Sequence, residues 1–517
     1  MVRASFFQRL RTRKQATESS DKKVILSSLS HNLDDNLQNM KRVLGDSSDL
    51  IVRELLIGNL NQRAAIIYLS GITDERRINN NILQMIQSNV KSFGNNILDD
   101  IEKEVISVTD THQSDDLDDI AFSILNGNTA FFMDGIERVL LMGTAGGKER
   151  AIEQPDSETL IRGPREGFVE SIQTNLALIR RNIKDPNLRF KEFEIGERSK
   201  QKLVLCYIEG ITNENIITEV NRRLETIDID YASDSATVEQ WIEDSFLSPF
   251  PQLLDTERPD RVIFELMQGR IAILLDGSPF ALIGPISIAD TVHSMEDYNQ
   301  RWLTSSLLRL LRFLTVIISL ILPALYIALV SYHPGMIPIT LTYSIAATRE
   351  GVAFPTGIEA ILMAVTFEIL HEAGVRLPKI IGQTIGIVGG LVIGESAVSA
   401  GIVSPIMVVV TALTAISSFS IPIYSATASF RILRFAFMIA ASFLGLYGIA
   451  LAYIMVNIHF VNLKSIGMPY SVPFSPVFFK DLKDVVIRAP ITNLTRRPRY
   501  LKPFDNQSKN TNLKKRK

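Results

Sequence analysis

A run of 20 residues without a charge, FLTVIISLILPALYIALVSY, extends from Phe313 to Tyr332. A helix of this length crosses a hydrocarbon core of about 30 Å. The residues before it, RWLTSSLLRLLR, combine arginines and leucines with Trp302, which is typical of an amphipathic helix at a membrane surface. This segment therefore predicts a membrane-spanning helix, and it constrains the fold more than any other feature of the chain.

The rest of the chain is too polar to lie in a membrane throughout. Of the 517 residues, 46% are hydrophobic and 21% are charged, so we expect a soluble part joined to a membrane part. The net charge of -2 does not favour nucleic acid as a partner, and the basic residues at the two ends either contact membrane lipid or form solvated tails. A single cysteine, Cys206, excludes a disulfide within the chain. No apolar run follows the basic N-terminus, so we expect no cleaved signal peptide and a cytoplasmic first part.

Two pairs of segments indicate an internal duplication. The segment IIYLSGITDERRINNNI at 66–82 returns as LCYIEGITNENIITEV at 205–220. Farther along, GNTAFFMDG at 127–135 returns as GRIAILLDG at 269–277, at nearly the same offset. Two independent matches at one offset predict that the soluble part contains the same unit twice.

Each copy has the pattern of a small α/β subdomain. An apolar strand leads to a Gly-Ile-Thr turn and a helix, for which Thr73 or Thr212 would be the N-cap. A later strand ends in Asp-Gly, which suits a tight hairpin turn. These motifs could instead be ligand loops, but turn chemistry accounts for them.

A second uncharged helix is predicted from Phe435 to Asn457, and the apolar sequence between the two spans is interrupted. Glycines and a proline break the segment 336–373, and such a break at membrane depth is tolerated only where it is buried in protein or lines water. Residues Ile402 to Ser429 would supply a further crossing. If 336–373 crosses once there are five spans and the tail lies outside; if it re-enters, there are four and both termini are cytoplasmic.

The predicted fold is therefore an α+β/α membrane protein, with two similar cytoplasmic α/β subdomains followed by an α-helical transmembrane domain with broken helices and a short cytoplasmic tail. The domains that we expect are a basic disordered N-terminus (1–27), a first α/β subdomain (28–150), a second α/β subdomain (151–295), a transmembrane domain (296–460) and a C-terminal region with a basic tail (461–517).

Four glycines in the second half of the apolar region repeat every four residues, which places them on one face of a helix. Such a ridge lets a neighbouring helix approach closely in lipid. A ligand site would need polar groups beside it, so we interpret the ridge as a packing surface. It consists of Gly382, Gly386, Gly390 and Gly394.

Charged residues in the broken segment need partners. An unpaired charge in the bilayer costs about 3 kcal/mol on insertion scales, so we expect Arg349 and Glu350 to be an internally satisfied intramembrane ion pair, joined either to each other's neighbours or across a subunit boundary. The alternative is an exposed interfacial loop. His371 and Glu368 lie near one face of a helix, but two groups do not make a metal site. We predict no enzyme, no metal and no cofactor.

A helix beginning at Thr356 carries two different faces. One face is an apolar stripe, which would line a pore if several such helices formed a ring with this face inward. The stripe could then close the pore by excluding water, while Glu359 and Glu368 near the pore mouths would attract cations. The alternative for such a stripe is ordinary helix packing, and a second possible pore face contains Glu359, Met363 and Thr366. The candidate gate residues are Ile358, Leu362, Val365 and Ile369.

Several long motifs resemble the A subunit of bacterial spore germinant receptors, the GerA family, in the order in which they occur there. The resemblance covers roughly residues 28 to 500, and motifs of this length are specific. Glu395 departs from the family pattern, which has an uncharged glutamine there, so we carry no role over to it. The motifs are GPREGF, NLALIRRNIKD, PFPQLLDTERPDRV, GRIAILLDGSPFALIGP, YHPGMIPITLTYSIAATREGVAFP, EILHEAGVRLPK, GIVGGLVIGESAVSAGIVSP and DLKDVVIRAP.

This resemblance implies a multi-pass protein of the cell membrane, in the inner membrane of the spore. It also implies homo-oligomers around an ion-conducting pore, and action with a transporter-like B subunit and a lipoprotein C subunit to trigger germination by nutrients. The alternatives are a secondary transporter, a scaffold subunit of the germination apparatus, and a stationary paralogue without its own germinant. An inverted repeat among the membrane segments would favour a transporter, and the sequence shows none.

Overall fold

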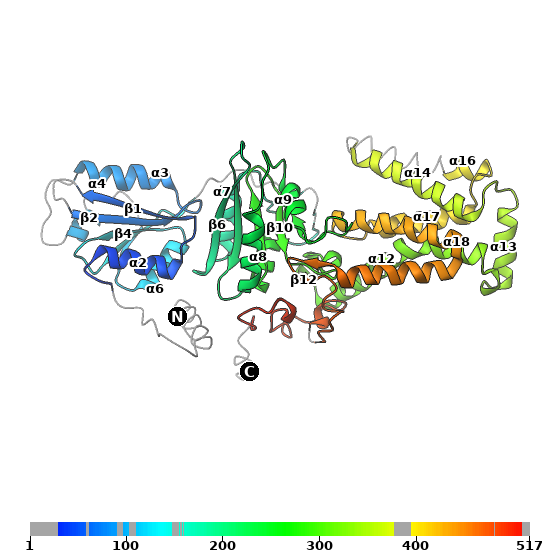
Figure 1. The fold of residues 1–517 in the computed structure, drawn as a ribbon. Helices are drawn as coiled ribbons and strands as arrows, with labels where there is room; N and C mark the ends of the chain where they lie inside the picture. The colour runs from blue at the N-terminus through cyan, green and yellow to red at the C-terminus, as the bar shows by residue number, and fades with distance from the viewer. Residues whose placement is uncertain are drawn as a thin grey trace. The chain divides into compact units, whose positions relative to one another are not determined.

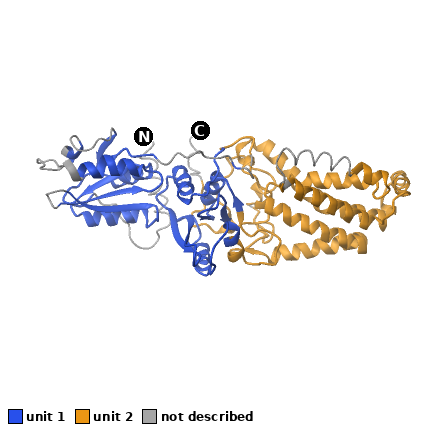
Figure 2. Ribbon diagram, turned by 90° about the horizontal axis from the view of Figure 1, so that it is seen from above, with its two compact units in different colours: residues 1–157, 165–238, 255–283 blue, residues 158–164, 239–254, 284–517 orange. Residues whose placement is uncertain are grey.

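The computed structural model describes residues 29–57, 62–89, 97–102, 110–146, 155, 158, 160–376, 394–479 and 481–508. These residues form two compact units (Figure 2). One comprises residues 1–157, 165–238 and 255–283, and contains most of two β-sheets. The other comprises residues 158–164, 239–254 and 284–517, and is mainly helical.

The first sheet has five strands in the order β1-β2-β4-β5-β3, and neighbouring strands pair antiparallel. In β2 successive side chains point to opposite faces, as the pleat requires. Ala65 and Ile67 therefore pack with α2 (Leu33–Leu44) and α6 (Leu117–Leu125), whereas Ala64 and Ile66 belong to a second core on the other face. The strands are β1 (Leu50–Ile57), β2 (Gln62–Leu69), β3 (Thr111–Ser114), β4 (Thr129–Met133) and β5 (Val139–Met142).

The second core lies under a helical segment that follows β2. Ile78, Ile82 and Ile86 from this segment cover Phe131 and Leu140 of the sheet. Figure 1 shows α3 and α4 on one side of the sheet, and α2 and α6 on the other. The first subdomain is thus a three-layer α/β sandwich. The segment comprises α3 (Glu75–Arg77), η2 (Ile78–Leu83) and α4 (Gln84–Asn89), and α5 (Ile97–Asp100) comes later in the chain.

The second sheet repeats the strand order of the first as β6-β7-β9-β10-β8. Register also repeats, since β6 pairs antiparallel with β7 along eight residues just as β1 does with β2. The duplication predicted from sequence thus corresponds to two sheets of one topology. The elements are α7 (Ile172–Asn182), β6 (Leu188–Ile195), β7 (Gln201–Ile208), α8 (Glu214–Leu224), α9 (Ser235–Ile242), β8 (Leu254–Thr256), α10 (Pro259–Gln268), β9 (Ile271–Leu275) and β10 (Ala281–Gly284).

The repeated Asp-Gly motifs have a second role besides turning the chain. The Asp134 carboxylate accepts a hydrogen bond of 3.0 Å from the backbone N–H of Leu33, the first residue of α2. In the second copy Asp276 accepts one of 3.1 Å from Ile172, the first residue of α7. A carboxylate at a helix N-terminus satisfies a free N–H and interacts favourably with the helix dipole. Each copy therefore uses its hairpin turn to cap a helix that lies far away in the sequence.

The predicted N-caps are displaced by one residue. Asp74 caps α3, and Asn213 caps α8 by accepting from the backbone of Asn215. Thr73 is buried and donates instead to the carbonyl of Gly127 at 3.0 Å. Thr73 and Thr212 were therefore wrong as caps, because both side chains turn into the fold and leave the next residue to cap the helix.

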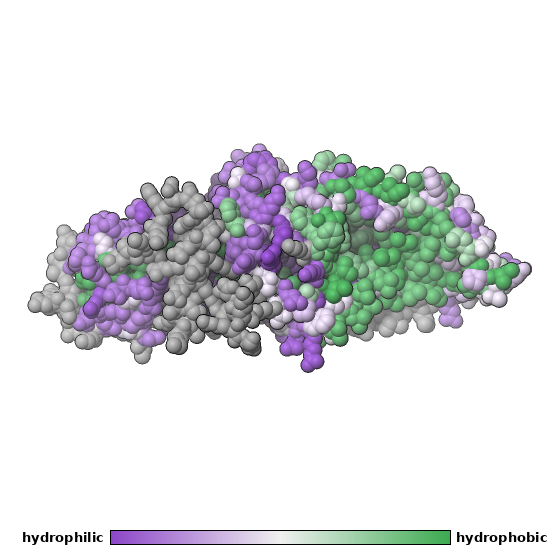
Figure 3. Space-filling model, turned by 90° about the horizontal axis from the view of Figure 1, so that it is seen from below, coloured by the Kyte–Doolittle hydropathy of each residue, from purple (hydrophilic) through white to green (hydrophobic). Residues whose placement is uncertain are grey.

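The helical unit contains two helices that are long and apolar enough to cross a membrane, judged by length and composition. They are α12 and α18, and the predicted first span, Phe313 to Tyr332, falls within α12 except for its last residue. Hydrophobic side chains cover much of this unit's surface in Figure 3. Its elements are η4 (Asp290–Val292), α11 (Glu296–Asn299), α12 (Trp302–Ser331), η5 (Pro334–Met336), α13 (Ile339–Arg349), α14 (Thr356–Arg376), α16 (Gly394–Ser399), α17 (Pro405–Ser418), α18 (Tyr424–Asn462), β11 (Lys464–Ser465), β12 (Met468–Pro469), η7 (Leu482–Asp484) and η8 (Arg499–Leu501).

The second predicted span is not one straight helix. Within α18, Gly445 has φ 58° and ψ -138°, so two helices meet there. Phe430 before this point and Phe460 after it both contact the ring of Phe250, with centroid distances of 5.5 and 4.6 Å. Because both ends of α18 reach the same side chain, the chain reverses at Gly445 into a helical hairpin.

The stretch Ile402 to Ser429, for which a further crossing is predicted, is not one continuous helix. Helix α17 ends at Ser418, and α18 begins at Tyr424. Pro422 lies in the non-helical connection, and a proline there cannot continue the preceding helix. This stretch therefore contains the 14-residue helix α17, a turn and the beginning of α18.

Candidate functional site

A buried carboxylate lies where the broken helices meet. The side chain of Glu359, in the first turn of α14, is 0% exposed. Its Oε2 accepts a hydrogen bond of 2.5 Å from Nη1 of Arg349, the last residue of α13. Its Oε1 accepts from the backbone N–H and the hydroxyl of Ser404, at 2.7 and 2.6 Å. Both carboxylate oxygens are thus satisfied by groups from two other elements.

Ser404 connects this carboxylate to α17. Its hydroxyl caps α17 by accepting from the backbone N–H of Met407 at 3.3 Å, and Pro405 occupies the first helical position. The hydroxyl of Tyr326, on α12, lies 3.3 Å from the same Ser404 oxygen. The site therefore joins α12, α13, α14 and α17.

The interruption between α13 and α14 is itself supported by hydrogen bonds. The backbone N–H of Ala353 donates to the carbonyl of Gly401 at 3.0 Å, and the N–H of Val352 donates to that of Arg349. Gly401 has φ 66°, and a Cβ there would lie 2.5 Å from the carbonyl oxygen of Gly351. Only glycine allows this close approach of two backbone segments. The helix predicted from Thr356 begins at that residue.

The structure pairs Arg349 with Glu359, ten residues later, and not with Glu350. Glu350 is exposed and follows the last helical residue of α13. Adjacent residues on a helix do not face each other, whereas the break folds the first turn of α14 back toward Arg349. Arg349 therefore has its partner within the chain, in Glu359, and it does not pair with the adjacent Glu350.

A second ion-pair cluster lies farther along α14. Glu368 accepts hydrogen bonds from Arg431 at 2.5 Å and from Arg434 at 3.5 Å, both on α18. Of these three side chains, that of Arg434 is the most buried. Two arginines face one carboxylate, so the cluster carries an excess of positive charge.

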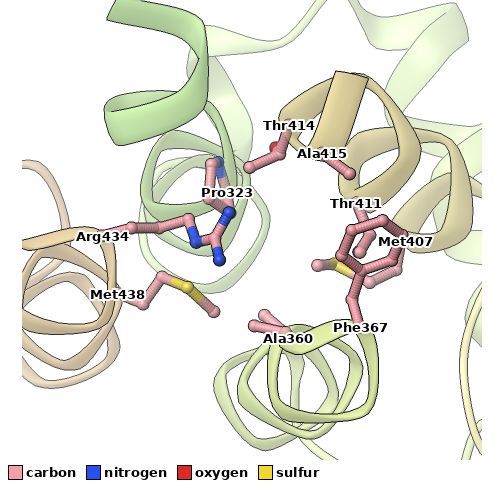
Figure 4. A pocket seen from close by; sticks show the side chains of 10 residues that line it. Pro323, Ala360, Phe367, Met407, Thr411, Thr414, Ala415, Arg434 and Met438 are labelled. Carbon is pink, nitrogen blue, oxygen red and sulfur yellow. The ribbon is translucent and has the colours of Figure 1, made fainter. Parts of the chain in front are cut away.

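The Arg434 side chain also lines a narrow hollow between four helices (Figure 4). Met438 lies beside it on α18, and Thr411 lies on α17. In the described part of the chain, neither Nε of Arg434 nor the hydroxyl of Thr411 has a hydrogen-bond partner, although both are buried. The remaining lining residues are Pro323, Ala360, Ala364, Phe367, Met407, Thr414 and Ala415.

The predicted apolar stripe of α14 faces away from the core of this chain. Its four residues are 41 to 64% exposed, while Ala360, Met363 and Ala364 on the same helix are buried among other helices. Within one subunit the stripe is therefore not part of the core of the helical unit. The stripe residues are Ile358, Leu362, Val365 and Ile369.

The glycine ridge falls largely outside the described residues. Gly382, Gly386 and Gly390 are not described, and Gly394 is the buried first residue of α16. A Cβ on Gly394 would lie 3.6 Å from a methyl group of Val408, which is an ordinary contact. Glu395 next to it is exposed.

Four residues of these two ion-pair clusters were not predicted: Tyr326, Ser404, Arg431 and Arg434. Ser404 could have been found, because Ser followed by Pro is a signature of a helix start. Arg431 and Arg434 interrupt an otherwise apolar region, which is itself a signal of internal pairing. In the described ranges no group of three histidine, cysteine, aspartate or glutamate side chains could hold a metal ion.

The fold and these clusters define a two-part class of protein: a duplicated α/β portion, joined to a bundle of apolar helices whose buried charges are paired internally. Residues 38–500 match the model of the Bacillus/Clostridium GerA spore germination protein family. The chain belongs to this family, as its sequence motifs predicted.

Individual relatives match along most of the chain. Spore germination protein GerLA of Bacillus cereus is 46% identical, over 93% of this chain and 98% of its own length. Spore germination protein B1 of Bacillus subtilis is 41% identical, over 92% of this chain and 98% of its own length. One solved structure also matches: the crystal structure of the N-terminal domain of the A subunit of the Bacillus megaterium spore germinant receptor GerK3. Its sequence is 38% identical to this chain, and the match has a TM-score of 0.41 over 50% of this chain and 96% of that domain.

Proposed function

We propose that this chain is the membrane-embedded A subunit of a nutrient germinant receptor, and that it forms homo-oligomers which conduct cations when spores germinate. Family membership supports the role in germination. The proposed location is the inner membrane of the spore, with transporter-like B and lipoprotein C subunits as partners. The observation that carries the channel proposal is the exposed apolar stripe on α14.

Contacts at the base of the helical unit support a topology with both flanks in the cytoplasm. Arg309, near the start of α12, pairs with Asp297 before the helices at 2.9 Å and with Asp484 after them at 3.2 Å. Tyr298 also donates to Asp484 at 2.9 Å. Residues that touch cannot lie on opposite sides of a bilayer, so the chain would cross an even number of times. An even number of crossings favours a cytoplasmic tail over the five-span alternative.

The gate would consist of the apolar stripe alone. Glu359 is held by Arg349 and Ser404, and Glu368 by two arginines, so neither carboxylate is free to attract cations at a pore mouth. In a ring of subunits, Leu362 and Val365 would narrow the pore enough to exclude water. The polar clusters would fix each α14 behind this surface.

Resting ion leakage from liposomes tests the gate. Replacing Val365 or Leu362 by alanine should increase leakage without nutrient, because a wider apolar constriction wets more readily. Ile439→Ala on α18 is the matched control, since Ile439 is also exposed and apolar but lies off the stripe. If a verified oligomer carrying either stripe variant leaks no more than the control at equal abundance, the stripe is not a gate.

A secondary transporter is the second candidate, since the break between α13 and α14 resembles the interrupted helices in which transporters bind substrate. A secondary transporter would couple the movement of its substrate to that of an ion, and its rate would saturate with substrate. A monomer of the chain would be sufficient for this transport. Conductance that requires the oligomer would exclude this candidate.

A further inference from the structure

Two large apolar side chains stand next to each other at the tip of the loop between α9 and β8. Phe246 is 85% exposed and Leu247 is 82% exposed. Isolated exposed hydrophobic residues are common, but a consecutive pair of this size on a fixed loop is a specific apolar protrusion. We refer to this pair as the loop tip.

The loop tip is held in place by a buried glutamine. Oε1 of Gln252 accepts from the backbone N–H groups of Asp244 and Ser245, at 2.8 and 2.9 Å. Its Nε2 donates to the carbonyl of Ser245 at 2.6 Å. One side chain thus closes the loop on itself and presents Phe246 and Leu247 outward.

The loop is also attached to both ends of the apolar hairpin α18. The hydroxyl of Ser248 lies 2.9 Å from Nε2 of His459, in the last turn of α18. Phe250 packs between Phe430 and Phe460, and Ser429 donates to the carbonyl of Pro249. The loop tip therefore lies where the apolar helices end, which is the level of the lipid headgroups if α18 crosses a bilayer.

We propose that the loop tip inserts into the boundary between lipid headgroups and acyl chains, and so anchors the 243–252 loop to the membrane surface. The inference rests on the membrane embedding proposed for α18. A phenylalanine and a leucine at this boundary remove apolar surface from water, as the apolar residues of interfacial segments do. Continuity with the helix ends favours lipid over a protein partner, because the tip extends from the same packed aromatic cluster.

Two acidic residues precede the tip: Asp244 is exposed and accepts a hydrogen bond of 3.1 Å from the backbone N–H of Gly467, and Glu243 is half-buried. Burial raises the pKa of Glu243 to about 7, so its carboxyl group is partly protonated at neutral pH. A partly neutral carboxyl group costs less beside lipid than a fully charged one.

A nitroxide label on an introduced cysteine tests the anchor. Phe246→Cys and Leu247→Cys are made in the full-length chain and reconstituted in vesicles of phosphatidylcholine and phosphatidylglycerol. Cys206 stays in place, because it is buried and burial raises the pKa of its thiol, so it will not label. The readout is the rate of collision with apolar oxygen relative to a water-soluble nickel chelate.

Two further sites calibrate the measurement. Ile454→Cys, midway along the second arm of α18, reports lipid, and Leu56→Cys on β1 reports water, since both residues are exposed. We expect the oxygen-to-nickel ratios at 246 and 247 to be several-fold above the ratio at 56 and closer to the ratio at 454.

Three results would overturn the proposal, and each has a separate meaning. If the label at 454 reports lipid while those at 246 and 247 collide freely with nickel, the tip is in water and the membrane embedding stands. If neither reagent reaches 246 and 247, a protein surface covers the tip. If 454 itself collides freely with nickel, the membrane embedding proposed for α18 fails as well.

Discussion

Arg349 donates to Glu359 across a break in the helical bundle, and within the described part of the chain Glu359 forms no other ion pair. The pair closes the gap between α13 and α14, while the second carboxylate oxygen holds the start of α17 through Ser404. An uncompensated charge at such a buried position is costly, so each member of the pair requires the other.

Glu359→Gln should therefore destabilise the helical unit by about 3 kcal/mol, because the amide cannot neutralise Arg349. Glu350→Gln is the matched control, and it should change stability by less than about 0.5 kcal/mol, since Glu350 is exposed. The measurement is the thermal unfolding of the purified full-length protein in detergent. A larger effect at Glu350 than at Glu359 would contradict this assignment of the pair.

The hairpin in α18 depends on a single glycine. A Cβ on Gly445 would lie 3.0 Å from the ring of His333 and 3.0 Å from Cβ of Tyr332, and its positive φ is strained for any other residue. Gly445→Ala should cost about 1–3 kcal/mol and lower the yield of folded protein. Gly374→Ala in α14 meets no atom within 4 Å, so it should be neutral or slightly stabilising.

Folded yield is measured by size-exclusion chromatography in detergent after equal expression. Equal yields for the two glycine variants would show that Gly445 does not have to adopt this conformation.

Much of the α/β portion could be predicted because its signals are local. The repeated strands and turns appear directly in the sequence, and the two sheets have one strand order. The start of α14 could be predicted for the same reason, since Pro355 fits the position before a first helical turn.

The helical portion was less predictable because its contacts are not local. Hydropathy averages over a window, so the reversal at Gly445 is invisible in a continuous apolar run. Sequence spacing on one helix pairs neighbours three or four residues apart, and it cannot reveal that Arg349 meets Glu359 across a break. The deep placement of Glu359 depends on Ser404, which lies 45 residues away.

Another buried ion pair joins the two α/β copies. Arg180 of α7 donates to Asp49, just before β1, at 2.8 and 2.9 Å, and their side chains are only 2% and 5% exposed. Arg180→Met should destabilise this unit by about 3–5 kcal/mol, because Asp49 would remain buried without its partner. Lys202→Met is the control, since the Lys202–Glu192 pair is exposed and should contribute less than about 1 kcal/mol.

Hydrogen exchange in β6 and β7 of the full-length chain measures this effect. Faster exchange in Arg180→Met than in Lys202→Met is expected, and equal rates would mean that the buried pair contributes little.

His293 should give the helical unit a dependence on pH. Burial lowers the pKa of His293 to about 4, and the charge of Arg309 acts in the same direction. Nε2 lies 2.9 Å from the carbonyl of Val485, to which a neutral ring can donate. In the unfolded chain the imidazole takes up a proton near pH 6.5, whereas in the folded protein it does so only near pH 4. The stability from this site is therefore present above pH about 6.5 and is lost as the pH falls through about 4, by no more than about 3 kcal/mol.

His293→Gln keeps a side-chain N–H for the Val485 carbonyl but does not titrate. Its midpoint of thermal unfolding should fall less than that of the wild type between pH 6.5 and pH 4.5, because other titrating groups contribute equally to both proteins. His31→Gln, at an exposed histidine, should keep the wild-type slope. If the slope of His293→Gln equals that of His31→Gln, His293 does not resist protonation in the folded state, and its link to the C-terminal segment does not depend on a neutral ring.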